Sequence, residues 1–154
     1  FETRYDTAFA QVMVECAAPR EGQAGTWIVP EMVRAYTRLH DMGFAHSVES
    51  WRDGNLAGGL YGILLDRVFF GESMFSRETD ASKVALVKLV ERVTSLGVRV
   101  IDCQQATRHL ASLGAREIPR RDFARLLAES IQYPPTGSRW PATEEAWPSS
   151  TTSP

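Results

Sequence analysis

The segment Val68-Phe69-Phe70-Gly71-Glu72-Ser73-Met74-Phe75-Ser76-Arg77 decides how this chain is built. It begins as an apolar run typical of a buried strand and then places a glycine and an acid where the strand should end. Glu72 lies between large apolar neighbours, so its carboxylate is poorly placed for full solvation. Burying an ionisable group is costly unless that group is paired or hydrogen-bonded. Glu72 is therefore either a well-satisfied structural group or part of a functional site.

The composition indicates one globular domain. The chain has 154 residues, of which 44% are apolar and 23% charged, as in ordinary water-soluble proteins. Its formal net charge of −2 provides no overall basic field for a polyanion. No apolar run approaches the roughly 20 residues of a membrane-spanning helix, and we expect no membrane partner. Cys16 and Cys103 lie in apolar segments, which predicts buried free thiols in a reducing compartment.

The patterns before and through this segment predict two helices and a three-strand antiparallel meander. Apolar residues recur at helical spacing from Phe9, behind a possible cap at Asp6, and again between Pro30 and Gly43. Alternating patterns then predict strands over 46–51, 56–65 and 68–72. Asp53-Gly54 is a strong hairpin-turn signal between the first two strands.

A helix–strand crossover should follow the meander. Asp80 can cap a helix over 81–96, and a strand is predicted over 98–104. Further on, the predicted elements are a short helix over 107–113, a brief strand over 116–118 and a last helix from Pro119. The residues from Tyr133 onward are rich in Pro, Ser and Thr, which predicts an extended or disordered tail. The expected organisation is a domain over 1–132 and a tail over 133–154.

The crossover should bring Glu72 to the same edge of the sheet as Asp102 and Gln104. Crossovers of this kind pair their two strands in parallel and in the right-handed sense. Glu72 ends the first strand, while Asp102 and Gln104 end the second. The carboxyl ends of parallel strands meet at one edge, where ligand crevices commonly lie. These side chains could therefore converge on one cleft, or Asp102 and Gln104 could simply cap the following turn.

Interpretations as a metal or phosphate site are weaker. The three histidines have no ligand-type spacing with the cysteines, so no metal is expected. The turn over 76–80 lacks glycine and carries two acids, which disfavours anion binding. A basic group interspersed with acids is either a solvated face or a local phosphate contact. Its members are Arg116, Arg120, Arg121 and Arg125.

Several stretches, in unbroken order from about residue 5 to residue 127, carry a resemblance to a known family. They are Gly25-Thr26-Trp27-Ile28, Ala35-Tyr36 with Leu39-His40, Ala45-His46-Ser47-Val48-Glu49-Ser50-Trp51, Gly58-Gly59-Leu60-Tyr61-Gly62, Gly71-Glu72-Ser73-Met74-Phe75-Ser76-Arg77, Ala81-Ser82-Lys83, Ile101-Asp102-Cys103-Gln104, Ala111-Ser112-Leu113-Gly114-Ala115 and Ile118-Pro119-Arg120-Arg121. Together these stretches resemble the leucyl/phenylalanyl-tRNA–protein transferases.

The resemblance implies both a fold and an activity. The fold would be α+β, a GNAT-like acyltransferase domain whose mixed, mostly antiparallel sheet has one βαβ crossover and flanking helices. Members of the family move Leu or Phe from charged tRNA onto proteins that begin with Arg or Lys, which marks those proteins for degradation. The implied partners are therefore Leu- or Phe-charged tRNA and such acceptor proteins, with no cofactor. We also expect a monomer in the cytoplasm.

The same resemblance assigns a polar catalytic centre to Glu72, Asp102 and Gln104. Glu72 and Asp102 would mainly bind cations, namely the ammonium of the donor amino acid and the basic side chain of the acceptor. Gln104 could donate a hydrogen bond to the carbonyl oxygen as negative charge develops there. In the competing assignment, Asp102 acts as a base through Gln104.

A pocket for the donor is carried over in the same way. Trp27 resembles the aromatic residue that meets the terminal adenosine of the tRNA, and Tyr36 would assist nearby. Ser73 is a weaker candidate for substrate binding. The residues that look like the lining for the donor side chain are Leu60, Phe69, Met74, Leu86, Leu89, Val93 and Ile101.

Departures from the family pattern leave alternatives open. Family members carry a smaller N-terminal domain, whereas this sequence begins at Phe1, so we expect a fragment or a processed form with weak tRNA binding. Leu89 and Val93 stand where the family often has aromatic residues, which predicts a wider pocket. One alternative is a GNAT N-acetyltransferase that uses acyl-coenzyme A. The other is a non-catalytic module that binds peptides or aminoacyl groups.

Overall fold

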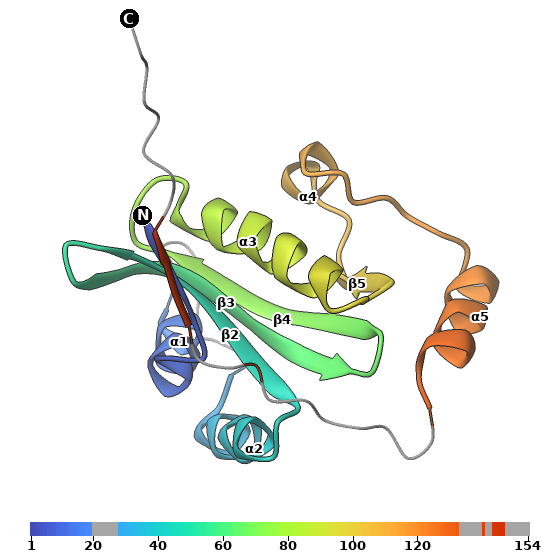
Figure 1. The fold of residues 1–154 in the computed structure, drawn as a ribbon, viewed down its shortest axis with the longest axis horizontal. Helices are drawn as coiled ribbons and strands as arrows, with labels where there is room; N and C mark the ends of the chain where they lie inside the picture. Colours follow the sequence, from blue (N-terminus) through green and yellow to red (C-terminus); the bar gives the residue numbers. More distant parts are fainter. Residues whose placement is uncertain (20–27, 133–139, 141–142, 147–154) are drawn as a thin grey trace, which may run out of the picture.

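Six strands form one sheet in the order β5-β4-β3-β2-β1-β6 (Figure 1). The computed structural model describes residues 1–19, 28–132, 140 and 143–146. The strands are β1 (Glu2–Tyr5), β2 (Ala45–Arg52), β3 (Asn55–Leu65), β4 (Val68–Ser76), β5 (Val100–Asp102) and β6 (Thr143–Ala146). Neighbouring strands are antiparallel except for the parallel pair β4 and β5. The predicted fold class, with its mostly antiparallel mixed sheet and single crossover, is confirmed.

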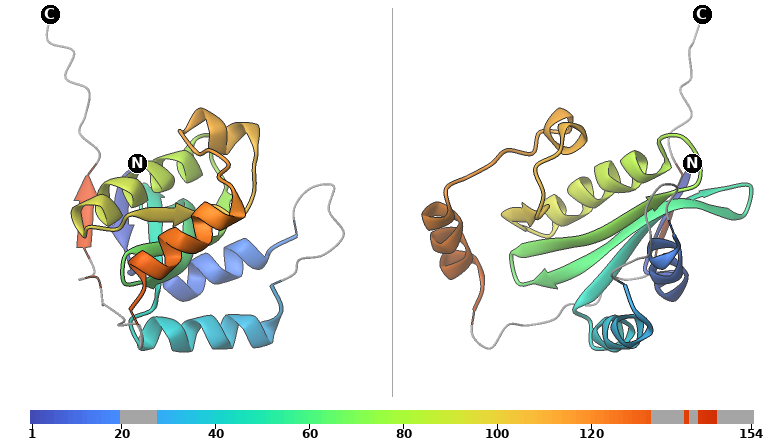
Figure 2. Two further views of the ribbon diagram at one scale, coloured as in Figure 1. Left: turned by 90° about the vertical axis from the view of Figure 1, so that its right-hand side faces the viewer. Right: turned by 180° about the vertical axis from the view of Figure 1, so that it is seen from behind.

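Helices cover both faces of this sheet, as Figures 1 and 2 show. They are α1 (Phe9–Ala17), α2 (Pro30–Asp41), α3 (Ala81–Ser95), α4 (Arg108–Ser112) and α5 (Arg120–Ser130). The first two pack on one face and α3 packs on the other, while α4 and α5 follow β5 at the edge of the sheet. No helix within the described ranges is both long and apolar enough to cross a bilayer.

The predicted meander is present, and its first turn has the expected geometry. Asp53 and Gly54 both have positive φ, +50° and +76°, as a type I′ hairpin turn requires. β4 runs on to Ser76 instead of ending at Glu72, and β5 covers only Val100–Asp102 instead of 98–104. The residues at 116–118, predicted as a brief strand, form none. The short strand β1 was not predicted.

The caps differ from the prediction because two aspartates bond elsewhere. Asp6 lies in a left-handed turn, and its carboxylate accepts a hydrogen bond from the backbone N–H of Ser47 at 2.7 Å. The N–H of Ala8, at the start of α1, instead donates to the buried carboxylate of Glu49 at 3.2 Å. Asp80 does precede α3, but it makes no side-chain cap. Asp6 therefore binds the backbone of β2, and the carboxylate of Asp80 pairs with Lys83.

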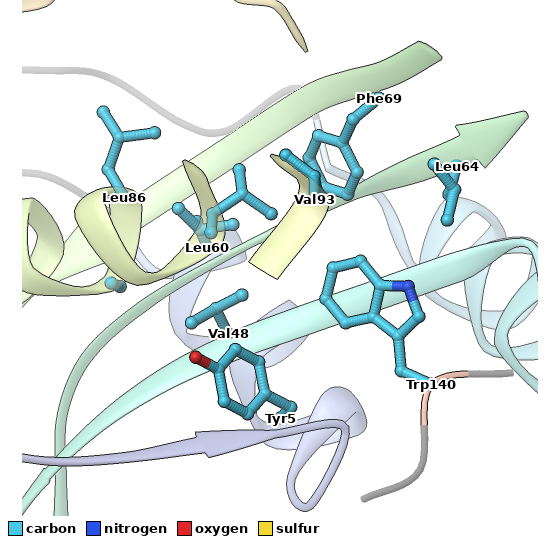
Figure 3. Packing of buried hydrophobic residues seen from close by; sticks show 10 residues of the cluster. Tyr5, Val48, Leu60, Leu64, Phe69, Leu86, Val93 and Trp140 are labelled. Carbon is cyan, nitrogen blue, oxygen red and sulfur yellow. The ribbon is translucent and has the colours of Figure 1, made fainter. Parts of the chain in front are cut away.

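Each face of the sheet has its own apolar core. The core under α1 and α2 includes Phe9, Val12, Met13, Cys16, Tyr61 and Phe75. The core under α3 includes Tyr5, Val48, Leu60, Leu64, Phe69, Leu86, Leu89, Val93 and Trp140, most of which Figure 3 shows. Helical spacing predicted a buried apolar stripe on α3 made of Leu86, Leu89, Val90 and Val93. Leu86, Leu89 and Val93 are buried as expected, whereas Val90 is 44% exposed.

Trp140 joins the α3 core although it lies in the segment predicted as an extended or disordered tail. Its side chain is 4% exposed and stacks on His46, with ring centroids 4.4 Å apart. Tyr5 meets it edge-on at 6.3 Å (Figure 3). β6 then pairs with β1 along its whole length. The buried indole of Trp140 and the edge strand β6 therefore both pack against the rest of the domain.

Truncation of Trp140 should destabilise the whole domain. Trp140→Ala would empty a space between Tyr5, His46 and Phe69, and deleting a large buried aromatic side chain costs about 3–5 kcal/mol. Urea unfolding followed by circular dichroism measures this change. Val14→Ala, at a side chain that is 60% exposed, serves as the control and should change stability by less than about 0.5 kcal/mol. Equal stability of the two variants would contradict the burial of Trp140.

Candidate active site

The parallel pairing of β4 with β5 ends early and leaves one edge of β4 free. The register joins Val68 with Val100, Phe69 with Ile101 and Phe70 with Asp102, and no pair follows. β4 nevertheless continues to Ser76 through its pairing with β3. A cavity of about 590 Å³ lies along the free edge and is lined by residues from both faces of the sheet. The cavity thus forms at the carboxyl ends of the crossover strands, where the sequence predicted a cleft.

Glu72 occupies a β-bulge beside this cavity. Tyr61 pairs with Ser73 and Gly62 pairs with Gly71, so Glu72 is the extra residue that no β3 residue opposes. Bulges turn a side chain out of the regular alternation and are common next to active sites. Gly62 permits the close packing here, since a Cβ on it would collide with the carbonyl oxygen of Phe70 and the ring of Phe69. The bulge therefore explains how an acid leaves a strand of apolar residues.

The carboxylate of Glu72 has a tyrosine beside it. The hydroxyl of Tyr36 on α2 lies close enough for a hydrogen bond to this carboxylate to contribute to the pKa of Tyr36. The ring of Tyr36 packs edge-on against Tyr61, with centroids 5.3 Å apart. Burial, followed by the nearby Glu72 charge and this hydrogen bond, raises the pKa of Tyr36 to about 12. Burial also raises the pKa of Tyr61, with smaller contributions from Cys16, Tyr36 and Glu72. This side of the cavity is therefore a negatively charged, partly dehydrated corner.

The α3 side of the cavity is apolar. Five of the predicted pocket residues line it: Leu60, Met74, Leu86, Leu89 and Ile101. Ser73 lines the cavity as well. Phe69 and Val93 are not among its lining residues; Phe69 is fully buried in the core, and Val93 lines a second cavity of about 430 Å³ between α3, β5 and α4. Tyr36 contacts the site through Glu72, and Trp27 lies outside the described residues.

Asp102 and Gln104 play different structural parts. The Asp102 carboxylate accepts a hydrogen bond from the backbone N–H of Gln104 at 2.8 Å, as the turn-capping alternative predicted. Gln104 has φ +59° and donates from Nε2 to the carbonyl oxygen of Gly71 at 3.0 Å. Gln104 lines the cavity together with Glu72, whereas Asp102 is not among the lining residues. Asp102 therefore fixes the turn that presents Gln104 to the cavity.

Several residues that line the cavity were not predicted. They are Cys16, Ala18, Tyr61, Gly71, Cys103, Gln105, Thr107, His109 and Leu110. Tyr61 had a detectable signal, because alternation along a strand puts it on the opposite face from Leu60. No sequence signal indicated that Cys16 and Ala18 would line the cavity, because only the folded chain brings the end of α1 to β4. Burial raises the pKa of the Cys103 thiol, so this cysteine remains protonated near neutral pH.

The turn between β4 and α3 offers little positive charge to a phosphate. Arg77 makes a two-pronged ion pair with Glu15, at 2.8 and 2.7 Å. Arg52 pairs with Glu78, and Lys83 pairs with Asp80. Each of these basic groups near the turn is therefore neutralised by an acid. Among the described residues, no group of three or more His, Cys, Asp or Glu is arranged to hold a metal ion.

The raised pKa of Tyr36 predicts how stability changes in alkaline solution. The folded state keeps the phenolic proton up to about pH 12, whereas an unfolded chain loses it near its ordinary pKa of 10.0. Stability is thus fully present below the unfolded pKa and falls as the pH rises from there toward the folded value. Tyr36→Phe should lose stability more slowly over this window.

Urea unfolding at pH values from about 9 to about 11 tests this expectation. Glu72→Gln is the matched variant, because it removes the charge that contributes to the shift while leaving the tyrosine buried. Its loss of stability with pH should lie between those of the parent chain and Tyr36→Phe. If the free energy of unfolding changed with pH by the same slope in all three proteins, that result would contradict the contact between Glu72 and Tyr36.

Comparison with known proteins places this chain in a family. The family model described as leucyl/phenylalanyl-tRNA protein transferase matches residues 1–128. The leucyl/phenylalanyl-tRNA–protein transferase of Aromatoleum aromaticum is 58% identical over 146 residues, covering 95% of this chain and 62% of the relative. That of Thiobacillus denitrificans is 58% identical over 140 residues, covering 91% and 61%. The chain therefore spans about three fifths of the length of the curated relatives it matches.

A solved structure agrees on the fold. An aminoglycoside acetyltransferase from an uncultured soil metagenomic sample, crystallised with sisomicin, aligns with a TM-score of 0.50. It is 15% identical, and the alignment covers 76% of each chain, so the likeness concerns the acetyltransferase-type fold alone. The match of the family model over most of the sequence is the stronger finding. By that match, the chain belongs to the leucyl/phenylalanyl-tRNA–protein transferase family.

Proposed function

We propose that this chain is an aminoacyltransferase domain that moves Leu or Phe from charged tRNA onto the N-terminal Arg or Lys of an acceptor protein, marking that protein for degradation. The observation that carries the proposal is the two-sided cavity at the free edge of β4. Its apolar side suits an aliphatic or aromatic side chain, and its acidic corner suits a cation. Both substrates of such a transfer carry an apolar portion and a cationic group. The curated relatives bear the name of this activity.

The apolar side would hold the side chain of the donor amino acid. Leu86 and Leu89 from α3 face Leu60 and Met74 from the sheet across this part of the cavity. Burial of a Leu or Phe side chain contributes about 1.5–3 kcal/mol, enough to favour these donors over small or polar ones. Aliphatic walls and a flexible methionine accommodate either shape.

The reaction would be aminolysis of an ester. The α-amine of the acceptor attacks the aminoacyl carbonyl carbon, the new C–N bond forms, and the C–O bond to the tRNA ribose breaks. The proton lost by the amine ends on the departing ribose oxygen. An α-amino group has a pKa of about 7.7–8.0, so about a tenth of it is already neutral near pH 7. Positioning the reactants can contribute about 7–11 kcal/mol, more than a general base would need to add.

The polar residues would position charge for this step. Glu72 would hold a cationic group in the acidic corner. Gln104 has an amide group at the cavity that can donate to the carbonyl oxygen as negative charge develops there. Asp102 would act by holding the Gln104 turn, which the hydrogen bond at 2.8 Å supports. In the alternative assignment, Asp102 serves as a base through Gln104.

The proposal also covers the cellular compartment and the oligomeric state. Charged tRNA and proteins with basic N-termini meet in the cytoplasm, so the chain would act there, and we propose that it acts as a monomer. An acyl-coenzyme A reaction is the second candidate, and the fold likeness to an acetyltransferase favours it. The neutralised basic groups around the β4–α3 turn oppose it.

Transfer of labelled Leu tests the proposed function directly. We expect the chain to move Leu from leucyl-adenosine, a minimal donor that needs no tRNA body, onto a peptide that begins with Arg. Glu72→Gln should lower this transfer at least tenfold, on the order of one lost charge-assisted hydrogen bond. Val14→Ala, at an exposed side chain of α1, is the control and should keep parental transfer. Absence of transfer from both the minimal donor and charged tRNA would sink the proposal.

Coenzyme A should not bind. Because Arg77, Arg52 and Lys83 are paired with acids, adding coenzyme A or acetyl-coenzyme A should leave the melting temperature unchanged. Differential scanning fluorimetry measures this, with leucyl-adenosine as the ligand expected to raise the melting temperature. A rise with coenzyme A, together with acetyl transfer to a peptide, would favour the second candidate instead.

A further inference from the structure

Tyr61 is fully buried, yet its hydroxyl has no hydrogen-bond partner among the described residues. Buried polar atoms are nearly always satisfied, so an unpaired one in a native structure calls for an explanation. The ring itself is well accommodated, with Tyr36 edge-on at 5.3 Å and Phe9 edge-on at 6.1 Å. Packing therefore explains why the aromatic ring is buried, but it does not explain why a hydroxyl group is buried with it.

The position of Tyr61 supplies the second observation. The residue lines the cavity and lies opposite Ser73, next to the bulge at Glu72. The hydroxyl of Tyr36 lies beside the carboxylate of Glu72, and a carboxylate can accept several hydrogen bonds. Tyr61, whose buried phenol oxygen is unsatisfied among the described residues, and Glu72, whose carboxylate has spare acceptor capacity, thus both line this cavity. A ligand group with several N–H donors would complement them.

We propose that Tyr61 is a substrate-binding residue whose phenolic oxygen accepts a hydrogen bond from a cationic N–H group that Glu72 holds at the same time. This inference rests on the proposed function and assigns it a further specificity residue. An ammonium has three N–H donors and a guanidinium has five, so either can serve two acceptors at once. The cation comes either from the acceptor, as its Arg or Lys side chain, or from the donor, as its α-ammonium.

Tyr61→Phe isolates the hydroxyl, because the ring and its packing remain. Removing an unsatisfied buried hydroxyl should not lower the melting temperature. The Michaelis constant for the substrate that carries the cation should rise about tenfold, as expected for one lost hydrogen bond to a charged group, while kcat changes little. Thr3→Val is the matched control, since Thr3 also has a buried hydroxyl with no partner among the described residues but does not line the cavity. It should leave both constants unchanged.

Two substrate series identify the source of the cation. If it is the acceptor side chain, Tyr61→Phe weakens use of an Arg-starting peptide but not of its uncharged citrulline analogue. If it is the donor ammonium, the variant weakens use of leucyl-adenosine but not of its α-hydroxy analogue. Either result supports the proposal. Unchanged Michaelis constants for both charged substrates would overturn it, and so would a fall in melting temperature that accounts for the loss of activity.

Calorimetric titration with arginine amide and with leucine amide separates this inference from the proposed function. Should the parent chain transfer nothing, the proposed function fails, but weaker binding of either amide by Tyr61→Phe than by Thr3→Val still supports the cation contact. Equal binding of both amides by the two variants, or no binding by the parent chain, would reject the contact whatever the transfer assay shows.

Discussion

The short parallel pairing between β4 and β5 is the constraint on which the rest of the site depends. The two strands share only the register from Val68 to Phe70, and no residues pair beyond it. Unpaired backbone groups at a sheet edge are costly when buried, so an opening at this point must be kept accessible or bridged. Gln104 provides one bridge through its hydrogen bond to Gly71. The opening is therefore stabilised as a cavity instead of collapsing into a longer sheet.

Much of this arrangement could be predicted from residue patterns. Alternation and the Asp53-Gly54 turn are local signals, and a right-handed crossover follows from chain sterics alone. Those rules are enough to place Glu72 and Gln104 at one edge of the sheet. Helical periodicity also identified the buried residues Leu86, Leu89 and Val93 of α3, although it wrongly included the exposed Val90. Local pattern and general topology were sufficient for these features.

What could not be predicted depends on contacts between residues far apart in the chain. Asp6 is a good cap by residue type, but in the folded chain its carboxylate accepts the backbone N–H of Ser47 instead. The bulge at Glu72 has no local signal, because it arises from how β3 and β4 match in register. Trp140 lies in a segment whose average composition predicts disorder. Burial of its indole side chain in the core nevertheless orders this residue, which composition alone does not reveal. The division of the cavity into an apolar and an acidic side has the same origin.

The pairing of β1 with β6 has a consequence for how the domain folds. These strands are separated by most of the chain, and residues 143–146 hydrogen-bond to the strand that ends at Tyr5. Contacts of such long sequence separation form late, because the loop that they close is large. During synthesis, the meander and α3 could assemble before β6 and the indole of Trp140 are available to pack against β1 and the core. Residues 143–146, which are translated after the meander and α3, would then complete the edge of the sheet beside β1.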